Sequence, residues 1–184
     1  GLHALSANQT GIQNTAVGWH ALYAYTGSYN TAFGNQALED CSTGTANTAV
    51  GFDCAREITT GTHNTAVGSG ALDTATTAGS NCAFGAGALN DATDGTYNIA
   101  IGYRSASYST VLTGGHKNIC IGSDSYTSNN GATGQIVIGT YQSGGKGNST
   151  GFIDPNGGGV YQGNNSTTWS QTSDIRIKKN IVDN

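Results

Sequence analysis

The stretch NTAVGFDCAREITTGTHNTAVG, residues 47–68, begins and ends with the same pentapeptide, one period of 17 residues apart. Related pentapeptides recur along most of the chain as NTAVG, NTAFG, NTAVG, NTAVG, NCAFG, NIAIG, NICIG and QIVIG. Their last residues are Gly18, Gly34, Gly51, Gly68, Gly85, Gly102, Gly122 and Gly139, at intervals of 16, 17, 17, 17, 17, 20 and 17 residues. A fixed period of this kind is typical of solenoids, in which each coil stacks only on its neighbours.

Seventeen residues are too few for a pair of helices, but they suit short strands joined by turns. Glycines on both sides of each pentapeptide provide turn residues, and its asparagine tolerates a left-handed backbone. The sequence therefore predicts an all-β fold, a parallel β-solenoid of about 17-residue coils and about 40 Å in length. GLHAL at 1–5 matches GWHAL at 18–22, and the chain has no methionine, so we expect it to be part of a longer protein.

The composition agrees with a thin object that has little interior. Glycine accounts for 29 of the 184 residues, hydrophobic residues make up 36% and charged residues 10%. A net charge of −4 is too small for a disordered chain of this hydrophobicity. Seven basic against eleven acidic residues argue against nucleic acid as a partner. No apolar run approaches the length of a membrane span and no signal peptide is visible, so we expect no membrane insertion.

Each pentapeptide contributes two columns of side chains that point to opposite faces of the expected sheet. One column consists of Val17, Phe33, Val50, Val67, Phe84, Ile101, Ile121 and Ile138, and we expect it to form the interior. The other consists of Ala16, Ala32, Ala49, Ala66, Ala83, Ala100, Cys120 and Val137. A face of small residues lets another backbone approach closely, so we expect identical chains to pack on it around an axis.

The unit Asn-Thr-Ala-Val-Gly followed by xxAL resembles the head repeats of trimeric autotransporter adhesins, and NIAIG at 98–102 is the nearest local match. The resemblance covers residues 1–141. It implies a left-handed parallel β-roll with three chains side by side, that is, a homotrimer.

The segment SDIRIKKNI, residues 173–181, resembles the start of the intramolecular chaperone domain of viral tail fibres and endosialidase-type tailspikes. That family begins Ser-Asp-x-Arg-x-Lys-x-Asn-Ile, and its chaperone cuts itself off between the serine and the aspartate after assembling three chains. The resemblance implies that Ser173 is the self-cleavage residue, Lys178 its basic partner and Asp174 the residue beyond the cut. A lysine can take a serine proton only when desolvation lowers its pKa, and residues 173–184 are too few to bury it, so we expect no cleavage in this chain. The alternative is an amphipathic strand with solvated charges.

Other candidate sites are weaker. Cys41, Cys54, Cys82 and Cys120 lack metal spacing, and we favour small-residue packing over disulfides for them. His3 and His20 occupy equivalent repeat positions, which favours a stacked ladder over a metal pair. We expect no metal, no cofactor and no paired carboxylates of the glycosidase kind.

Two irregular segments interrupt the repeat. The 20-residue interval should make residues 103–117 bulge from the rod, and Tyr103, Tyr108 and His116 are candidates for docking a sugar or a protein. A bulge without a partner is an equal alternative. Residues 142–172 should form a hairpin around residues 154–157 and a neck, before the chaperone start at 173–184.

Together these features favour a structural and host-surface-binding segment of a homotrimeric viral tail fibre, located in the virion. Its partners would be two identical chains and a host-surface glycan or protein, and it would not be an enzyme apart from a single self-cleavage. The alternative is the head of a bacterial trimeric adhesin on the cell surface. Ice binding is a remote third, prompted by two threonine columns: Thr10, Thr26, Thr43, Thr60 and Thr77, and Thr15, Thr31, Thr48 and Thr65. The second column shares its parity with the expected interior valines, which argues against an ice-binding face.

Overall fold

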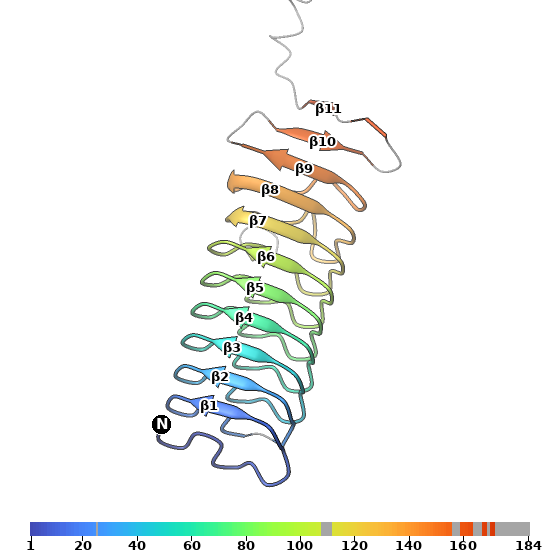
Figure 1. Cartoon of the computed structure of the whole chain (residues 1–184). Helices are drawn as coiled ribbons and strands as arrows, with labels where there is room; N and C mark the ends of the chain where they lie inside the picture. Colours follow the sequence, from blue (N-terminus) through green and yellow to red (C-terminus); the bar gives the residue numbers. More distant parts are fainter. Residues whose placement is uncertain (25, 108–111, 156–158, 164–166, 169, 172–184) are drawn as a thin grey trace, which may run out of the picture.

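The computed structural model describes residues 1–24, 26–107, 112–155, 159–163, 167–168 and 170–171. The chain winds into a β-solenoid whose strands stack into one long sheet (Figure 1). The parallel strands are β1 (Thr15–Val17), β2 (Thr31–Phe33), β3 (Thr48–Val50), β4 (Thr65–Val67), β5 (Cys82–Phe84), β6 (Ile99–Ile101), β7 (Ile119–Ser123), β8 (Ile136–Tyr141) and β9 (Gly151–Asp154). The described residues contain no helix. The all-β solenoid of about 17-residue coils predicted from the repeat is confirmed.

Equivalent repeat positions pair with one another across the sheet. Thr48 pairs with Thr65 and Ala49 with Ala66, and the same register holds from β1 to β6. The longer interval after Gly102 does not shift it, because Ile99 pairs with Ile119. The extra residues therefore lie in the connection between β6 and β7.

The sheet continues beyond the last repeat. Strand β9 pairs in parallel with β8, and it then pairs antiparallel with β10 (Val160–Gln162), which pairs antiparallel with β11 (Ser170–Gln171). An antiparallel pair thus lies where the sequence predicted a hairpin, and its first strand also forms the last parallel layer of the solenoid.

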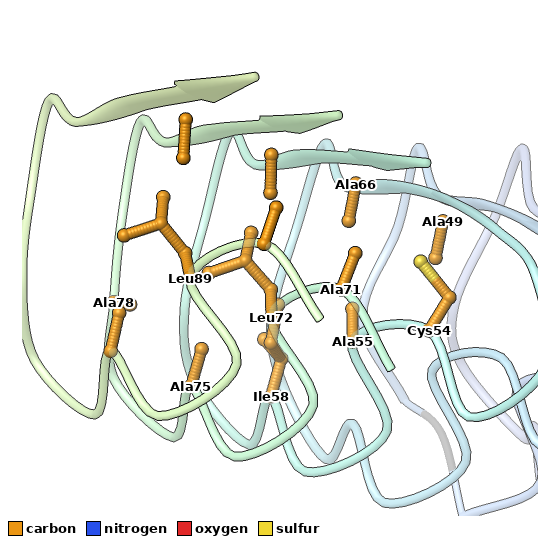
Figure 2. Close-up of a cluster of buried hydrophobic side chains, with 14 of the residues drawn as sticks. Ala49, Cys54, Ala55, Ile58, Ala66, Ala71, Leu72, Ala75, Ala78 and Leu89 are labelled. Carbon is orange, nitrogen blue, oxygen red and sulfur yellow. The ribbon is translucent and has the colours of Figure 1, made fainter. Parts of the chain in front are cut away.

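The interior of each coil is narrow and is lined by small strand residues. Ala32, Ala49, Ala66, Ala83, Ala100, Cys120 and Val137 all have no solvent exposure. They face leucines from the xxAL segments and residues of the opposite wall (Figure 2). The inward leucine of earlier coils, Leu89, is replaced by the smaller Ala106 in the next coil. The inward strand residue then becomes larger, from Ala100 through Cys120 to Val137, as close packing of the interior requires.

This arrangement reverses the two faces expected from the sequence. The alanine column, which we expected to meet other chains, is the core. The column from Val17 to Ile138, which we expected inside, points to solvent: Phe33 is 57% exposed and Phe84 56%. The physical reason is space, since the buried leucines fill the interior and leave room only for alanine under the strand.

A ladder of buried asparagines joins successive coils. The Oδ1 atoms of Asn30, Asn47, Asn64, Asn81 and Asn98 each accept a hydrogen bond from the backbone N–H of the next asparagine, at 2.7–3.0 Å. The Nδ2 atoms donate to a backbone carbonyl in the following coil, as in Asn64 to Ala78 at 2.8 Å. The ladder ends where Gln135 replaces asparagine and turns its side chain toward Ser128.

The asparagines do not occupy the left-handed backbone that the sequence suggested for them. That conformation falls on the residue before each one, for example Ala46 with φ 56° and His63 with φ 60°. The asparagine is present for its side-chain amide, which can both accept and donate where neither group can reach water.

Glycine at the end of each strand allows the coils to approach closely. A Cβ placed on Gly68 would lie 2.6 Å from the backbone of Gly85, and φ of Gly68 is 134°, which L-residues with side chains rarely adopt. The Val-Gly pair thus ends a strand and fixes the distance to the next coil.

We expect Asn64→Ala to destabilise the solenoid. The substitution removes a hydrogen-bond partner from the backbone N–H of Asn81 and from the carbonyl of Ala78, and each unsatisfied buried group costs about 1–3 kcal/mol. Circular dichroism should show a lower melting temperature than for the parent chain. The control is Asn35→Ala, since Asn35 is exposed. Equal melting temperatures of the two variants would contradict the ladder's role.

Candidate functional site

The largest candidate surface is the outer face of the sheet, formed by the outward side chains of β1–β8. Its first column consists of Thr15, Thr31, Thr48, Thr65, Cys82, Ile99, Ile119 and Ile136, and its second is the column from Val17 to Ile138. Neither column contains a charged residue. A sheet face that meets water normally presents polar side chains, so we name this surface the apolar sheet face and treat it as unusual.

The apolar sheet face changes along the rod. In β1–β4 the first column is threonine, and from β6 onward it is isoleucine, so both columns are apolar at that end. Beside the last strands the face is hollowed by a cavity of about 190 Å³ lined by Ile121, Gly122, Ile138, Gly139, Thr140, Ile153, Asp154 and Pro155. The C-terminal half is therefore the more hydrophobic half of the surface.

The first column also settles one point of the sequence analysis. Thr15, Thr31 and Thr65 are exposed and Thr48 is half-buried, so the column is not part of the interior as expected. Our reason for disfavouring an ice-binding face was wrong in this respect.

A polar ridge follows the sheet where the chain turns after each strand-ending glycine. Residues of neighbouring coils pair along it: His20 Nδ1 lies 2.6 Å from Glu39 Oε1, and Arg56 Nε lies 3.2 Å from Asp73 Oδ1. Burial raises the pKa of Asp73 to about 6, although Arg56 acts in the opposite direction. Polar contacts thus link neighbouring coils at these two places on the ridge.

The aromatic residues at the start of the rod form a stack on this ridge. The His20 ring lies against Trp19, with centroids 3.7 Å apart, and against Tyr23 at 4.4 Å. His3 meets His20 edge-on at 5.4 Å. The two histidine rings therefore touch edge to face and are not stacked on one another as the sequence suggested. In the described part of the chain, no group of three or more histidine, cysteine or acidic side chains could hold a metal ion.

None of the four cysteines forms a disulfide. Cys41, Cys54 and Cys120 are buried and Cys82 is half-buried. Cys120 takes the place of an alanine in the inward column and Cys82 that of a threonine in the outward column. Packing as small residues, which the sequence favoured over disulfides, is what the structure shows.

The candidate binding residues of the long interval do not form one site. Tyr103 follows β6 and is 56% exposed, whereas His116 precedes β7 and bonds to Thr96 at 2.8 Å through Nδ1. Parallel strands in register all begin at one edge of the sheet and end at the other. Tyr103 and His116 therefore lie at opposite edges of the sheet. Tyr108 lies outside the described residues, as do Ser173, Asp174 and Lys178.

No protein-family model, no curated protein and no solved structure matches the chain. The resemblances to adhesin heads and to the chaperone start thus depend on their motifs alone. Within the part of the chain that the structure describes, no helix has the length and hydrophobicity to cross a membrane.

We expect acidification to stabilise the chain through Asp73. Its pKa is about 6 in the folded chain and 3.8 in the reference state, so the folded state binds this proton more tightly. Stability from this group is therefore lost as pH rises from about 4 to above 6. The rise in melting temperature from pH 7.5 to pH 5 should be smaller in Asp73→Asn than in the parent.

The exposed Asp94 provides the control for that measurement. Asp94→Asn should keep the parent's difference between the two pH values. An unchanged difference in Asp73→Asn would show that desolvation of Asp73 does not matter.

Proposed function

We propose that the chain is a structural and host-surface-binding segment of a homotrimeric viral tail fibre. The observation that carries the proposal is the apolar sheet face, an uncharged surface along the whole solenoid. Exposed apolar patches of this extent mark interaction surfaces. The place in the virion comes from the resemblance of residues 173–181 to a fibre chaperone.

A second and third copy of the chain are the partners that fit this surface best. The face is flat and about 40 Å long, and its regular columns would meet the same columns of a parallel copy at every level. Phe33 and Phe84 then pack near their own symmetry mates, which buries the most exposed large side chains of the apolar sheet face. A closed ring of copies leaves no apolar face uncovered, and the number three follows from both resemblances.

This assembly differs from the one expected from the sequence. The contact is made by the valine, phenylalanine and isoleucine column, not by the alanines, which fill each chain's own core. Widening Ala66 would therefore disturb the fold of each chain rather than only the contact between chains.

The resemblance of residues 173–181 to a chaperone start is consistent with the same proposal. Three thin rods with apolar faces associate wrongly unless something fixes their register, and a C-terminal assembly domain would supply this. The isoleucine-rich end of the apolar sheet face is the end nearest to that domain in the sequence, so packing could spread from there toward β1.

Two alternatives remain. A bacterial adhesin head would use the same trimeric rod but would be followed by a stalk and a membrane anchor, which the sequence of the full gene decides. Ice binding regains weight because the threonine column points outward. However, Cys82 and the isoleucines replace threonine in the second half of the sheet, and a thermal hysteresis assay tests this alternative.

Ile101→Glu should break the trimer while leaving the solenoid folded. Ile101 is 40% exposed at the centre of the apolar sheet face, and three glutamates near one axis would repel each other and lose hydration. Native mass spectrometry should then find single chains where the parent gives trimers. Tyr97→Glu, at an exposed turn residue of the same coil, should remain trimeric, and a monomeric parent would refute the proposal.

The chaperone assignment predicts a cut after Ser173. In a chain that continues into a complete chaperone domain, intact-mass measurement should find a product that ends at Ser173. Ser173→Ala should assemble but keep its C-terminal part, whereas Thr172→Ala should be cut like the parent. Cleavage in the Ser173→Ala variant would exclude Ser173 as the reacting residue.

A further inference from the structure

The polar ridge is interrupted by a notch in the fifth coil. The ridge position two residues after each strand-ending glycine carries His20, Gln36, Asp53, Gly70, Gly87, Arg104 and Asp124 in successive coils. In the fourth and fifth coils this position is Gly70 and Gly87, so no side chain projects from the ridge there. A cavity of about 250 Å³ lies beside Gly87. It is lined by Gly87, Asn90, Asp91, Arg104 and Ser107.

The walls of the notch are held in place by hydrogen bonds between coils. Asn90 donates from Nδ2 to the carbonyl of Gly70 at 3.0 Å and from its backbone N–H to Ser107 Oγ at 2.7 Å. Thr74 Oγ1 donates to Asp91 Oδ1 at 3.3 Å. A site whose polar groups are fixed before binding loses little entropy when a ligand arrives.

Arg104, which belongs to the sixth coil, forms one wall of the notch. Its Nε lies 3.9 Å from Asp124 Oδ1, and its guanidinium carbon lies 6.0 Å from the ring centroid of Tyr103. The guanidinium thus lies within loose contact of a carboxylate and of an aromatic ring, and the side chain is 43% exposed. Tyr103, which precedes Arg104 in the sequence, has an exposed side chain.

We propose that this notch binds a neutral saccharide, one pyranose ring at a time. Adjacent hydroxyl groups of a sugar can donate to a carboxylate and accept from a guanidinium or an amide, and Asp91, Arg104 and Asn90 offer these groups together. The proposal rests on the proposed function, because it assigns the host-surface binding to a specific site.

The charges around the notch decide between a neutral and an acidic sugar. Asp91 lines the cavity and Asp124 already neutralises Arg104 in part. The carboxylate of Asp91 would repel a carboxylated or sulfated sugar, and the whole chain has a net charge of −4. One cation and one anion suit a ligand that has hydroxyl groups and no charge.

The test begins with the parent chain on an array of neutral and acidic oligosaccharides. Methyl glycosides of the hexoses that bind are then titrated by saturation-transfer NMR. Arg104→Ala and Asp91→Ala should each weaken binding about tenfold or more, because hydrogen bonds to charged groups are lost. Arg56→Ala, which removes another arginine from the same ridge, should bind like the parent.

Gly87→Gln is the most specific variant, because it fills the notch instead of weakening its walls. Gln36 occupies the same ridge position with φ 56°, close to the 66° of Gly87. A Cβ at position 87 would lie 3.3 Å from Cγ of Arg104, so the substitution requires a small shift of that flexible side chain. This variant should lose sugar binding while keeping the parent's circular dichroism spectrum.

Three outcomes would overturn the inference: no neutral sugar bound at millimolar concentration, binding of acidic glycans only, or unchanged binding in Gly87→Gln and Arg104→Ala. The oligomeric state of each sample separates this failure from that of the fibre. A trimer that binds no sugar refutes the notch alone, and a monomer that binds sugar through it refutes only the trimeric assembly.

Discussion

From Asn30 to Asn98, each coil depends on one buried carboxamide that satisfies the backbone of the next coil. The turn before each strand leaves an N–H and a carbonyl facing the interior, where no water can reach them. The asparagine side chain accepts from one and donates to the other, as Asn64 does for Asn81 and Ala78. Aspartate could not donate and leucine could do neither, so the first letter of the pentapeptide is fixed by hydrogen-bond chemistry. The glycine that ends the pentapeptide then sets how close the coils lie, because a Cβ at Gly68 would overlap the backbone of the next coil.

The same constraint determines which surface is available for function. Once asparagine points inward, the strand that follows it must turn its alanine inward and its two flanking residues outward. A chain with so thin a core therefore presents its largest apolar strand residues to the outside, Phe33 and Phe84 among them. Contacts between coils stabilise such a rod along its axis, but its apolar sheet face stays uncovered. The proposed trimer would cover this face, and the polar ridge beside the sheet carries the proposed ligand site.

The repeat predicted the fold class, the coil length and the parallel register, because a period in sequence becomes a period in space. It did not predict which face is inside, since alternation has two solutions when both columns are apolar. We assigned the larger column to the interior, as in most sheets, although the buried leucines of xxAL already fill that space. The alanine and leucine of xxAL, which recur in five coils, were the available signal. The asparagine ladder was missed because its residue type also suits turns, and the notch because a missing side chain at Gly87 leaves no motif.

The natural cysteines offer the most direct measurement of the inside and outside of the strands. Cys82 belongs to the outward threonine column, whereas Cys120 belongs to the inward alanine column, where burial raises its pKa to about 12. Alkylation by iodoacetamide can be mapped by mass spectrometry in the folded chain, separated into single copies by Ile101→Glu. The account predicts that Cys82 reacts first and that Cys120 reacts only on unfolding. Alkylation of Cys120 as fast as Cys82 in the folded chain would contradict it.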